Sequence, residues 1–429
     1  MKSTHTQALK QPSSPMQYKK IVAGSVGNMI EWFDWSIYAA FAIFFSSQFF
    51  PAGHDTAALL ATFGIFAVGF FMRPVGGFLI GIFSDRYGRR SALGLTVVMM
   101  AAGSLIIAIT PTFATIGILA PIMLTLARML QGLSLGGEYA SATTYLTEMA
   151  PNDKRGLYSS FIFFSAAMGI LCASGLGWLL TSTISKEAMV EWGWRIPFFI
   201  GALGGVVGMW IRRSVTEDEE APQDKSKAVK QPLRVLIRDY PVETMRIVGF
   251  SLLSTYAFYV FMAFLPTYAI RHAGAVPSTA FAANTIGIFV FMCLQPLFGM
   301  LSDKIGRRPQ LITFAAGNLF FFYLVINFVS DSFTTLLLIE LFGLTLYAMY
   351  SSVAPAIMAE QFPKNIRAVG IGAPYNLIVA ILGGTTPYIL TWLQSKQMEH
   401  IFFILVTVAA ALSLLTFIKM PESAGKDLE

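Results

Sequence analysis

Two acidic residues lie three positions apart in the first long apolar stretch of the chain. On a helix, Glu31 and Asp34 share one face, and Asn28 and Tyr38 extend that face into a polar stripe. An ionisable side chain inside an apolar segment costs several kcal/mol if it faces lipid, so these residues are candidates for function. The stripe can bind a charged or polar group. Alternatively, the acids form a structural ion pair that ties the first helix to a neighbour.

Two arginines also lie deep in apolar segments. Arg73 precedes Asp85 by 12 residues, which is ~18 Å along an ideal helix, and Arg128 lies similarly deep. A guanidinium binds a carboxylate through forked hydrogen bonds, so either arginine can bind an anionic group. Alternatively, the arginines neutralise Glu31 and Asp34. The two interpretations are compatible, because a carboxylate can exchange partners when an anion arrives.

These charges must be positioned by helices that cross a membrane. The chain is 55% hydrophobic and 13% charged, whereas about 25% of residues are charged in an average soluble domain. Its polar residues are too few to cover a soluble protein of this size. We therefore expect an all-α integral membrane protein. Twelve segments are long enough to cross a bilayer at ~20 residues each, namely 20–46, 58–83, 91–110, 116–142, 157–181, 194–212, 245–268, 279–301, 310–329, 333–357, 368–393 and 400–418.

An internal repeat divides these segments into two halves. The motif G-x-x-x-D-[RK]-x-G-R-R occurs at residues 81–90 and again at 299–308. A second pattern, E-x-x-P-x-x-x-R, begins at Glu148 and again at Glu360. Six crossings return the chain to the same side, so the halves run in the same direction as parallel repeats. We expect two six-helix bundles with a binding site between them near the membrane midplane.

The basic residues predict the orientation. With both termini in the cytoplasm, 24 of the 30 Lys and Arg residues fall on the cytoplasmic side, which is the positive-inside pattern. The net charge of +6 then reflects membrane anchoring and not nucleic-acid binding. Cys172 and Cys293 lie in different apolar segments, which indicates neither a disulfide framework nor a metal site. The expected units are a cytoplasmic tail (1–19), an N-terminal bundle (20–212), a cytoplasmic central loop (213–244), a C-terminal bundle (245–418) and a second cytoplasmic tail (419–429).

The second half lacks the intramembrane arginines of the first. Alignment of the two G-x-x-x-D motifs places Phe291 where Arg73 stands. A binding site needs neutral hydrogen-bonding walls around its charged centre, although tyrosines at this spacing also pack as ordinary helix contacts. Glu340 is an acid within a span of this half, and its role stays open. The candidate walls are Tyr256, Tyr259, Tyr375 and Asn376.

Four segments carry more specific patterns, at residues 28–34, 72–77, 128–139 and 192–198. They read NMIEWFD, MRPVGG, RMLQG followed by GGEY, and WGWRIPF. The paired G-x-x-x-D motif resembles the signature of the major facilitator superfamily. The four segments resemble its metabolite:proton symporter family, whose members carry 2-oxoglutarate, citrate, shikimate, or proline and betaine.

The resemblance implies that the paired motif loops act as gates. Asp85 and Asp303 can each bind a helix N-terminus or the adjacent arginines and so hold the cytoplasmic side shut. The basic residues of the loops also serve as topological anchors. The expected gating residues are Gly81, Asp85, Arg86, Gly88, Arg89, Gly299, Asp303, Lys304, Gly306 and Arg307.

Proton coupling requires a group that titrates within the spans. The histidines His5, His54, His272 and His400 fall in the tail, in loops or at a span edge, so the task falls to carboxyls. In general, burial raises the pKa of a carboxyl and a nearby arginine lowers it, so movement relative to an arginine can drive protonation and release. We expect Asp34 to carry the proton, with Glu31 as second choice. Glu138 is a further proton site or a structural partner.

The expected function is proton-coupled uptake of a small organic acid, such as 2-oxoglutarate or another di- or tricarboxylate, by alternating access. The two arginines favour an anion. The first alternative is a zwitterionic osmolyte such as proline or betaine, with its ammonium in an aromatic cage. Efflux is a weaker alternative, because the fifth span lacks the Gly-Pro motif of drug:proton antiporters. An enzyme is not expected, since the sequence shows no nucleophile–base arrangement, metal cluster or phosphate loop.

The expected setting is the cytoplasmic (inner) membrane of a bacterium. The protein is expected to be a monomer with no cofactor other than the coupling proton.

Overall fold

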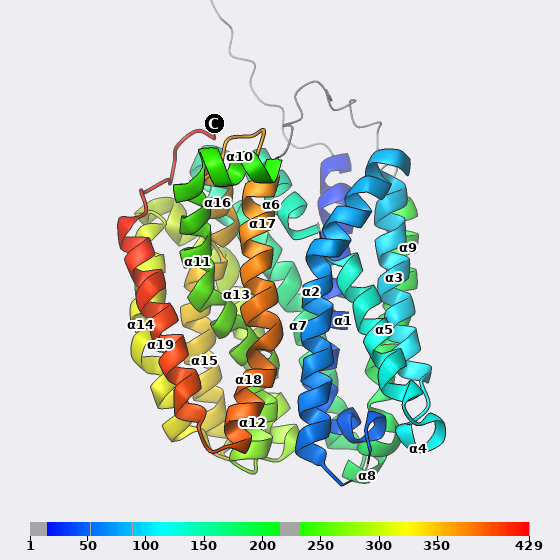
Figure 1. Cartoon of the computed structure of the whole chain (residues 1–429). Helices are drawn as coiled ribbons and strands as arrows, with labels where there is room; N and C mark the ends of the chain where they lie inside the picture. Colours follow the sequence, from blue (N-terminus) through cyan, green and yellow to red (C-terminus); the bar gives the residue numbers. More distant parts are fainter. Residues whose placement is uncertain (1–14, 52, 88, 137, 215–231, 429) are drawn as a thin grey trace, which may run out of the picture.

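The helices of the computed structural model follow the apolar segments of the chain. The structure describes residues 15–51, 53–87, 89–136, 138–214 and 232–428, and every regular element among them is a helix. Each of the twelve predicted spans coincides with a helical rod in this part of the chain. Figure 1 shows the rods running roughly parallel in two groups that lie side by side. The predicted all-α fold is confirmed.

The first six rods contain one break that the sequence analysis did not predict. The predicted span 116–142 is divided into α5 (Leu119–Ser134) and α6 (Glu138–Met149). The division falls next to Gly136-Gly137, and a glycine inside a helix costs about 1 kcal/mol relative to alanine. The other elements are α1 (Pro15–Phe49), α2 (Asp55–Tyr87), α3 (Arg89–Ile109), α4 (Phe113–Ile116), η1 (Asn152–Lys154), α7 (Arg155–Thr183), α8 (Lys186–Ala188), η2 (Met189–Gly193) and α9 (Arg195–Ser214).

The last six rods contain two π turns, each followed by a proline. Proline lacks an N–H group and clashes with the carbonyl four residues earlier, which belongs to Met262 for Pro266 and to Gly383 for Pro387. Both carbonyls lie within the π turns, so the wider turn accommodates the proline. The elements are α11 (Pro241–Tyr259), η4 (Val260–Phe264), α12 (Leu265–His272), α13 (Pro277–Ile305), α14 (Arg308–Phe328), α15 (Phe333–Ser351), α16 (Ala354–Glu360), α17 (Arg367–Ile378), η5 (Val379–Gly383), α18 (Gly384–Ser395) and α19 (Glu399–Lys419).

The predicted central loop contains a helix. Within residues 213–244, α10 (Pro232–Asp239) lies across one end of the bundle (Figure 1). It buries Leu236, while Leu233 and Ile237 are exposed. A proline at its first position starts the helix, because the missing N–H would be unpaired there in any case. We call the end with α10 and the C-terminal residues the motif end, and the opposite end the far end.

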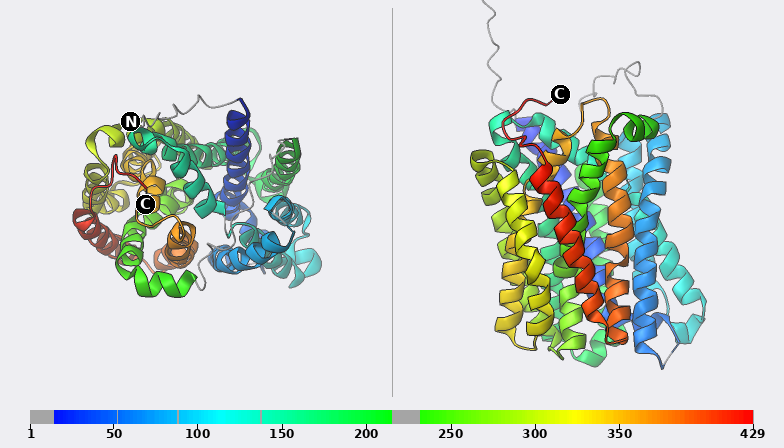
Figure 2. Two further views of the ribbon diagram at one scale, coloured as in Figure 1. Left: turned by 90° about the horizontal axis from the view of Figure 1, so that it is seen from above. Right: turned by 60° about the vertical axis from the view of Figure 1, so that its left-hand side comes forward.

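The two groups of rods meet along two seams. α7 packs along α13, and α2 packs along α18. In Figure 2 the orange α17–α18 rod lies beside the blue α2, in agreement with these contacts. A binding site between the halves is therefore lined by α1, α2, α5 and α7 on one side and by the C-terminal rods on the other.

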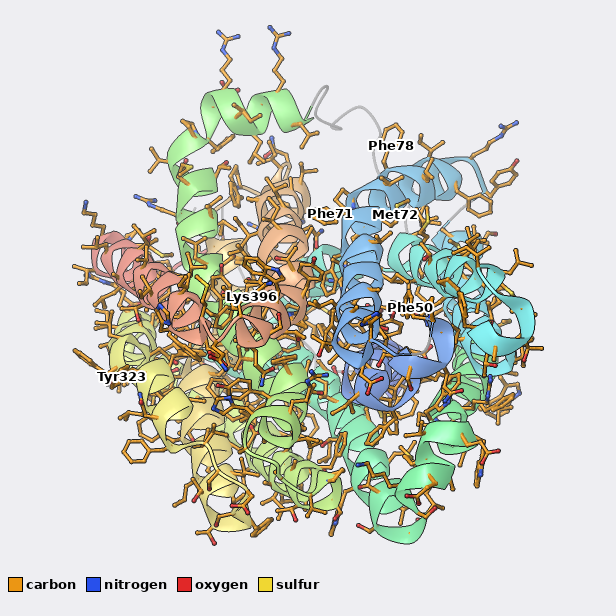
Figure 3. The ribbon with its side chains drawn as sticks, turned by 60° about the horizontal axis from the view of Figure 1, so that its bottom comes forward. Phe50, Phe71, Met72, Phe78, Tyr323 and Lys396 are labelled. Carbon is orange, nitrogen blue, oxygen red and sulfur yellow. The ribbon has the colours of Figure 1, made fainter. Side chains whose placement is uncertain are left out.

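The outer surface is apolar, as a lipid-facing surface must be. Phe71 and Phe78 of α2 and Tyr323 of α14 are exposed, and Phe78 and Tyr323 lie at the outside of the ribbon in Figure 3. By length and composition alone, seven helical segments of the described residues are long and apolar enough to cross a membrane, and three shorter apolar helices accompany them. The charged side chains discussed next are buried inside this apolar surface.

Candidate functional site

Arg128 of α5 is the centre of a buried aromatic cluster. Its side chain is 0% exposed. The guanidinium carbon lies 3.9 Å from the ring centroid of Trp35, 4.3 Å from that of Tyr38 and 5.1 Å from that of Phe66. A cation over an aromatic face is attracted by the negative face of the ring, and the attraction is stronger where water is absent. The rings of α1 and α2 therefore hold this charge inside the protein.

Neutral side chains link Arg128 to Asp34. Arg128 donates from Nη1 to Gln131 Oε1 at 2.8 Å, and Gln131 donates from Nε2 to Ser104 Oγ at 2.9 Å. Ser104 donates to Asp34 Oδ1 at 2.7 Å. Within the described part of the chain, Asp34 Oδ2 and Arg128 Nε and Nη2 have no hydrogen-bond partner. The cation and the acid thus communicate without direct contact, and both keep hydrogen-bonding capacity for a ligand.

Arg73 of α2 shares an aromatic ring with Arg128. Its guanidinium carbon lies 4.5 Å from the centroid of Trp35 and 4.3 Å from that of Phe70. Because both guanidiniums lie over the same indole, the two positive charges repel each other. The Tyr259 side chain, from the C-terminal half, and the Arg73 guanidinium both lie against the Phe70 ring. The site therefore contains two cations on one indole and a phenol that reaches them from the other half.

Glycines allow α2 and α5 to bring the two arginines together. A Cβ atom on Gly132 would overlap the backbone of Gly69, and one on Gly136 would overlap the backbone of Arg73 and Gly77. Small residues spaced four apart let two helix backbones approach closely in a membrane protein. The close approach of these two helices fixes the separation of the guanidiniums.

The C-terminal half contributes an aromatic wall. The Tyr259 ring contacts Phe70 of α2 at a centroid distance of 5.3 Å. The Tyr375 ring stacks on Tyr139 of α6 at 4.6 Å. These contacts join the halves around the arginines, so a ligand bound there would touch both halves.

The structure brings together some of the predicted site residues and not others. Asp34, Arg73, Arg128, Tyr38, Tyr259 and Tyr375 surround the same central region. Asn28 instead donates to the Ile162 carbonyl and to Ser165 Oγ of α7 at 3.1 and 2.7 Å. Tyr256 packs against Phe402 of α19.

For the remaining predicted residues, the structure gives little more than the degree of burial. Glu31 is partly buried and interacts with a neighbour. Asn376 is partly buried on α17. The side chain of Glu138 lies outside the described residues.

Four residues of the central region were not predicted as site residues. Trp35, Ser104, Gln131 and Tyr139 are neutral, and neutral side chains are common in membrane spans. Gln131 was detectable, because it follows Arg128 by three positions and shares its helical face. Trp35 is adjacent to Asp34, but nothing in the sequence shows that two arginines meet on it.

At the motif end, the repeated E-x-x-P-x-x-x-R pattern forms reciprocal ion pairs between the halves. Arg155 of the first half binds Glu360 of the second at 2.9 Å, and Arg367 of the second half binds Glu148 of the first at 2.5 Å. Each copy of the pattern therefore supplies an acid to one pair and an arginine to the other. These pairs hold the two halves together at this end.

The second copy of the G-x-x-x-D motif adds to this closure. Asp303 accepts hydrogen bonds from the backbone N–H groups of Gly156 and Leu157 at 2.8 and 2.9 Å, at the N-terminus of α7. It also binds Arg307 at 2.9 Å. Gly306 ends α13 with a φ of +92°, a conformation that glycine adopts without strain.

The other gating candidates are placed as follows. Gly299 lies against the Gly156 backbone, Lys304 is exposed, and Arg86 lies over the Tyr87 ring. In the first copy, Gly88 and the side chains of Asp85 and Arg89 lie outside the described residues, as does any contact of Gly81.

The C-terminal residues pack onto the same network. Glu422 accepts hydrogen bonds from the backbone N–H groups of Arg307 and Arg308, each at 3.0 Å. Ser423 donates to Glu360 Oε2, and the Lys426 carbonyl accepts from Arg155. Burial on its own lowers the pKa of Arg307, but Glu360 and Asp303 outweigh it and raise that pKa overall. The tail thus contacts both halves.

The far end is closed by different contacts. Phe281 of α13 packs against Phe41 and Phe44 of α1. Ser174 of α7 donates to Asn284 of α13 at 2.8 Å. Because contacts between the halves are present at both ends and the central arginines are buried, the structure corresponds to a closed state.

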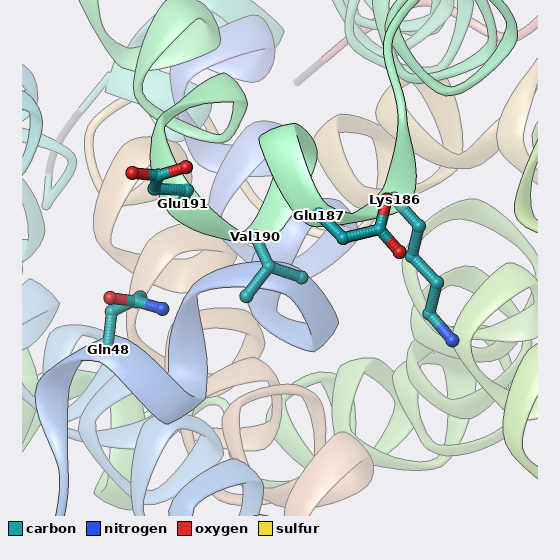
Figure 4. Close-up of a pocket in the computed structure, with 5 residues that line it drawn as sticks. All are labelled: Gln48, Lys186, Glu187, Val190 and Glu191. Atoms are coloured by element: carbon teal, nitrogen blue, oxygen red, sulfur yellow. The ribbon is translucent and has the colours of Figure 1, made fainter.

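A separate hollow at the far end lies outside this arrangement. It is open to solvent and has a volume of about 380 Å³. Its lining residues are Gln48 of α1 and Lys186, Glu187, Val190 and Glu191 of α8 and η2 (Figure 4). Its charged side chains point into solvent-exposed space and none reaches the central arginines.

Twelve rods in two halves, a charged centre between them and closures at both ends define a membrane transport protein. The chain belongs to the Major Facilitator Superfamily, whose sequence model matches residues 24–373 and 251–428. The members of this family that the chain matches are transporters and not enzymes.

Curated relatives and solved structures agree with this assignment. The chain is 39% identical over 400 residues to the alpha-ketoglutarate permease of Escherichia coli (strain K12), and the aligned region covers 92% of this chain and 91% of that protein. It is 32% identical over 433 residues to the proline/betaine transporter of Salmonella typhimurium, with coverages of 96% and 85%. The crystal structure of a D-xylose-proton symporter has the same fold, with a TM-score of 0.76 at 20% identity over 96% of this chain and 100% of that chain.

Proposed function

We propose that this protein imports a small organic acid, such as 2-oxoglutarate or another di- or tricarboxylate, together with protons. The observation that supports an anionic substrate is the pair of buried arginines on Trp35. None of the ion pairs found among the described residues uses Arg73 or Arg128. Buried cations without an acid partner attract an anion strongly. The similarity to an alpha-ketoglutarate permease supports the same class of substrate.

Asp34 is the proton carrier in this proposal. A substrate carboxylate that binds Arg128 competes with Gln131 for the guanidinium. Gln131 then changes its hydrogen bond to Ser104, and Ser104 changes its hydrogen bond to Asp34. Substrate binding at the arginine is thereby linked to proton binding at the acid. Glu31 and Glu138 remain alternative carriers.

Alternating access follows from the two sets of closing contacts. The halves rock so that the pairs Arg155–Glu360 and Arg367–Glu148 break when the motif end opens. The contacts of Phe281 and Ser174 break when the far end opens. We place the protein as a monomer in the inner membrane of a bacterium, with both termini and the motif end in the cytoplasm.

The second candidate substrate is a zwitterionic osmolyte such as proline or betaine. The observation in its favour is the aromatic cluster of Trp35, Tyr38, Phe66 and Phe70, which has the composition of a cage for a quaternary ammonium. The similarity to a proline/betaine transporter supports it too. In this structure, however, the rings already hold guanidiniums. The cluster is therefore better suited to keep two arginines available for carboxylates.

The test is uptake of labelled 2-oxoglutarate, citrate, shikimate, proline and betaine into proteoliposomes, with and without an inward proton gradient. We expect accumulation of a di- or tricarboxylate only when the gradient is present. Gradient-driven accumulation of proline or betaine alone would replace the proposed substrate with the second candidate. Uptake that ignores the gradient would remove proton coupling from the proposal.

A further inference from the structure

A second buried acid, Glu340, lies far from the central arginines. It is the eighth residue of α15, so it lies ~10 Å along the helix from the far end. Its side chain is 2% exposed. Oε1 accepts a hydrogen bond from Asn284 Nδ2 at 2.7 Å, and Oε2 has no hydrogen-bond partner among the described residues. A lone buried carboxylate is costly, and nothing in the proposed transport cycle uses this one.

The surroundings of Glu340 provide no compensating charge. Gly287 of α13 lies against the aliphatic part of Glu340 and against Leu344 of α15. Phe261 of η4 and Phe321 of α14 stack on each other close to the next turn of α15. Among the described residues, no ion pair includes Glu340, and its hydrogen-bonding partner is Asn284. A neutral, protonated carboxyl is the form that suits this setting.

Asn284 is itself held by the π turn η4, and so positions its amide against Glu340. Its Nδ2 also donates to the Phe261 carbonyl at 2.9 Å. In a π turn a carbonyl accepts from the residue five positions later, which for Phe261 is Pro266, a residue without an N–H group. The carbonyl is therefore available to Asn284, and the π turn positions the amide against the acid.

The same amide connects Glu340 to the other half of the protein. Asn284 Oδ1 accepts from Ser174 Oγ of α7 at 2.8 Å, and Ser174 Oγ also contacts Thr285 Oγ1 at 3.0 Å. The path Glu340–Asn284–Ser174 therefore runs from α15 through α13 to α7, across the seam that closes the far end. Separation of α7 from α13 removes one of the bonds that orient the amide.

We propose that Glu340 is a second proton-binding carboxyl, which holds its proton while the far end is closed and exchanges it with the medium at that end when α7 and α13 separate. This inference deepens the proposed proton-coupled transport by adding a second coupling site to Asp34. The Ser174–Asn284 contact is the sensor of closure, and Asn284 transmits the change to the acid.

Protonation of Glu340 can be measured without any substrate, by infrared difference spectroscopy of the purified protein during a pH titration. We expect a protonated-carboxyl band that persists in Asp34→Asn and is absent from Glu340→Gln. Ser174→Ala keeps Glu340 but removes the contact that senses closure. The Glu340 carboxyl should therefore lose its proton, and its band should disappear, at a lower pH than in native protein. If Glu340→Gln does not fold, the Ser174→Ala shift still decides the outcome.

Two results would overturn the inference. The first is a band pattern that is identical in native protein, Glu340→Gln and Ser174→Ala. The second is a Glu340 band that responds to Na⁺ in place of K⁺, which would assign the site to a metal cation. The spectrum is recorded without substrate, so it tests the Glu340 inference alone. Failure of the proposed transport function would instead appear as absence of gradient-driven uptake.

Transport gives an independent readout. The ratio of protons to substrate, obtained at clamped zero membrane potential from the pH gradient at which the net flux down a known substrate gradient reverses, should fall by one in Glu340→Gln. A purely structural role would lower the rate and leave this ratio unchanged, and an unchanged ratio therefore contradicts the inference.

Discussion

Trp35 contacts two positive charges at the centre of the protein. Each guanidinium gains about 0.5–2 kcal/mol from the indole face, which partly offsets the repulsion between Arg73 and Arg128. A planar cation is required for this arrangement, because a flat guanidinium can stack on the ring while its edge remains free for a carboxylate. The identity of arginine, and not only its charge, is therefore important here.

Arg128→Lys keeps the charge and removes the planar fork. We expect the KM for the carboxylate substrate to rise about tenfold or more, which corresponds to about 1.4 kcal/mol of binding energy. The measurement is initial uptake against substrate concentration in proteoliposomes. The matched control is Arg195→Lys at the far end, where the native arginine bonds the carbonyls of Ala108 and Thr110, and we expect its KM to stay near native. An unchanged KM in Arg128→Lys would contradict the assignment of Arg128 to the substrate.

The charged residues of the site were predictable, whereas the neutral ones were not. Asp34, Arg73 and Arg128 were identified because an ionisable residue in an apolar span needs an explanation. Ser104 and Trp35 give no comparable signal, since serine and tryptophan occur in membrane helices for packing alone. Their roles depend on distances between α1, α3 and α5 that sequence spacing does not contain.

At the scale of helices, the separation of α2 and α5 depends on glycine. Gly132 faces Gly69 with no room for a side chain, and Gly136 does the same against Arg73 and Gly77. The helix positions were predicted correctly, but the division of the fourth span into α5 and α6, the division of the tenth into α15 and α16, and the presence of α10 were not. Hydropathy locates apolar stretches, while these features depend on local contacts, such as that of Gly136 with the α2 backbone and the packing of Leu236 at the motif end.

Gly132→Ala tests this close contact. The added methyl group must push α2 and α5 apart, so we expect a loss of about 1–3 kcal/mol in stability and a lower melting temperature in detergent. The matched control is Gly94→Ala in α3, where an added Cβ meets nothing within 4 Å, and its melting temperature should be equal or higher. Equal melting temperatures for both variants would show that the helices are not in contact at Gly132.

Glu422 makes stability at the motif end depend on pH. Burial on its own raises the pKa of Glu422, but backbone N–H groups of residues 307, 308, 423 and 424 outweigh it and lower the pKa below its ordinary value of 4.5. The ionised carboxylate therefore stabilises the fold above pH 4.5, and this contribution is lost as pH falls through the lower folded pKa.

Glu422→Gln should accordingly have a lower melting temperature than native protein at pH 7, and the difference should shrink as the pH falls below 4.5. The control is Glu187→Gln on the exposed α8, whose melting temperature should follow that of the native protein. A difference that grows at acidic pH would have the wrong sign for a carboxylate with a lowered pKa.

At the scale of the whole molecule, the motif end is closed by ion pairs in which each half binds residues of the other half. Glu360 binds Arg155 and Arg307 at 2.9 and 3.2 Å, and Glu148 binds Arg367. The internal repeat was predicted from the sequence, and the major facilitator fold confirms it. The reciprocal pairing was not predicted, because it depends on how two repeats pack face to face. The residues themselves were already visible in the E-x-x-P-x-x-x-R pattern.

Glu360→Gln should open the motif end. Removing one partner of a buried ion pair costs about 3–5 kcal/mol, and this cost falls on the state in which the halves meet at that end. We expect spin labels on either side of the motif end to show a population at longer distance by double electron–electron resonance. The control is Glu243→Gln, whose partner Arg246 lies 3.9 Å away on the same partly exposed helix. An unchanged distance distribution in Glu360→Gln would mean that these pairs do not hold the motif end shut.

The central claim, that Asp34 couples proton binding to transport of an organic acid, is tested most directly by one comparison. Proteoliposomes contain native protein or Asp34→Asn. For exchange, they are loaded with unlabelled 2-oxoglutarate, and entry of labelled 2-oxoglutarate is measured. For accumulation, they are left empty and given an inward proton gradient. We predict that Asp34→Asn exchanges substrate near the native rate but accumulates it far less than native protein does, because one coupled proton is lost. Full accumulation by Asp34→Asn would contradict the account.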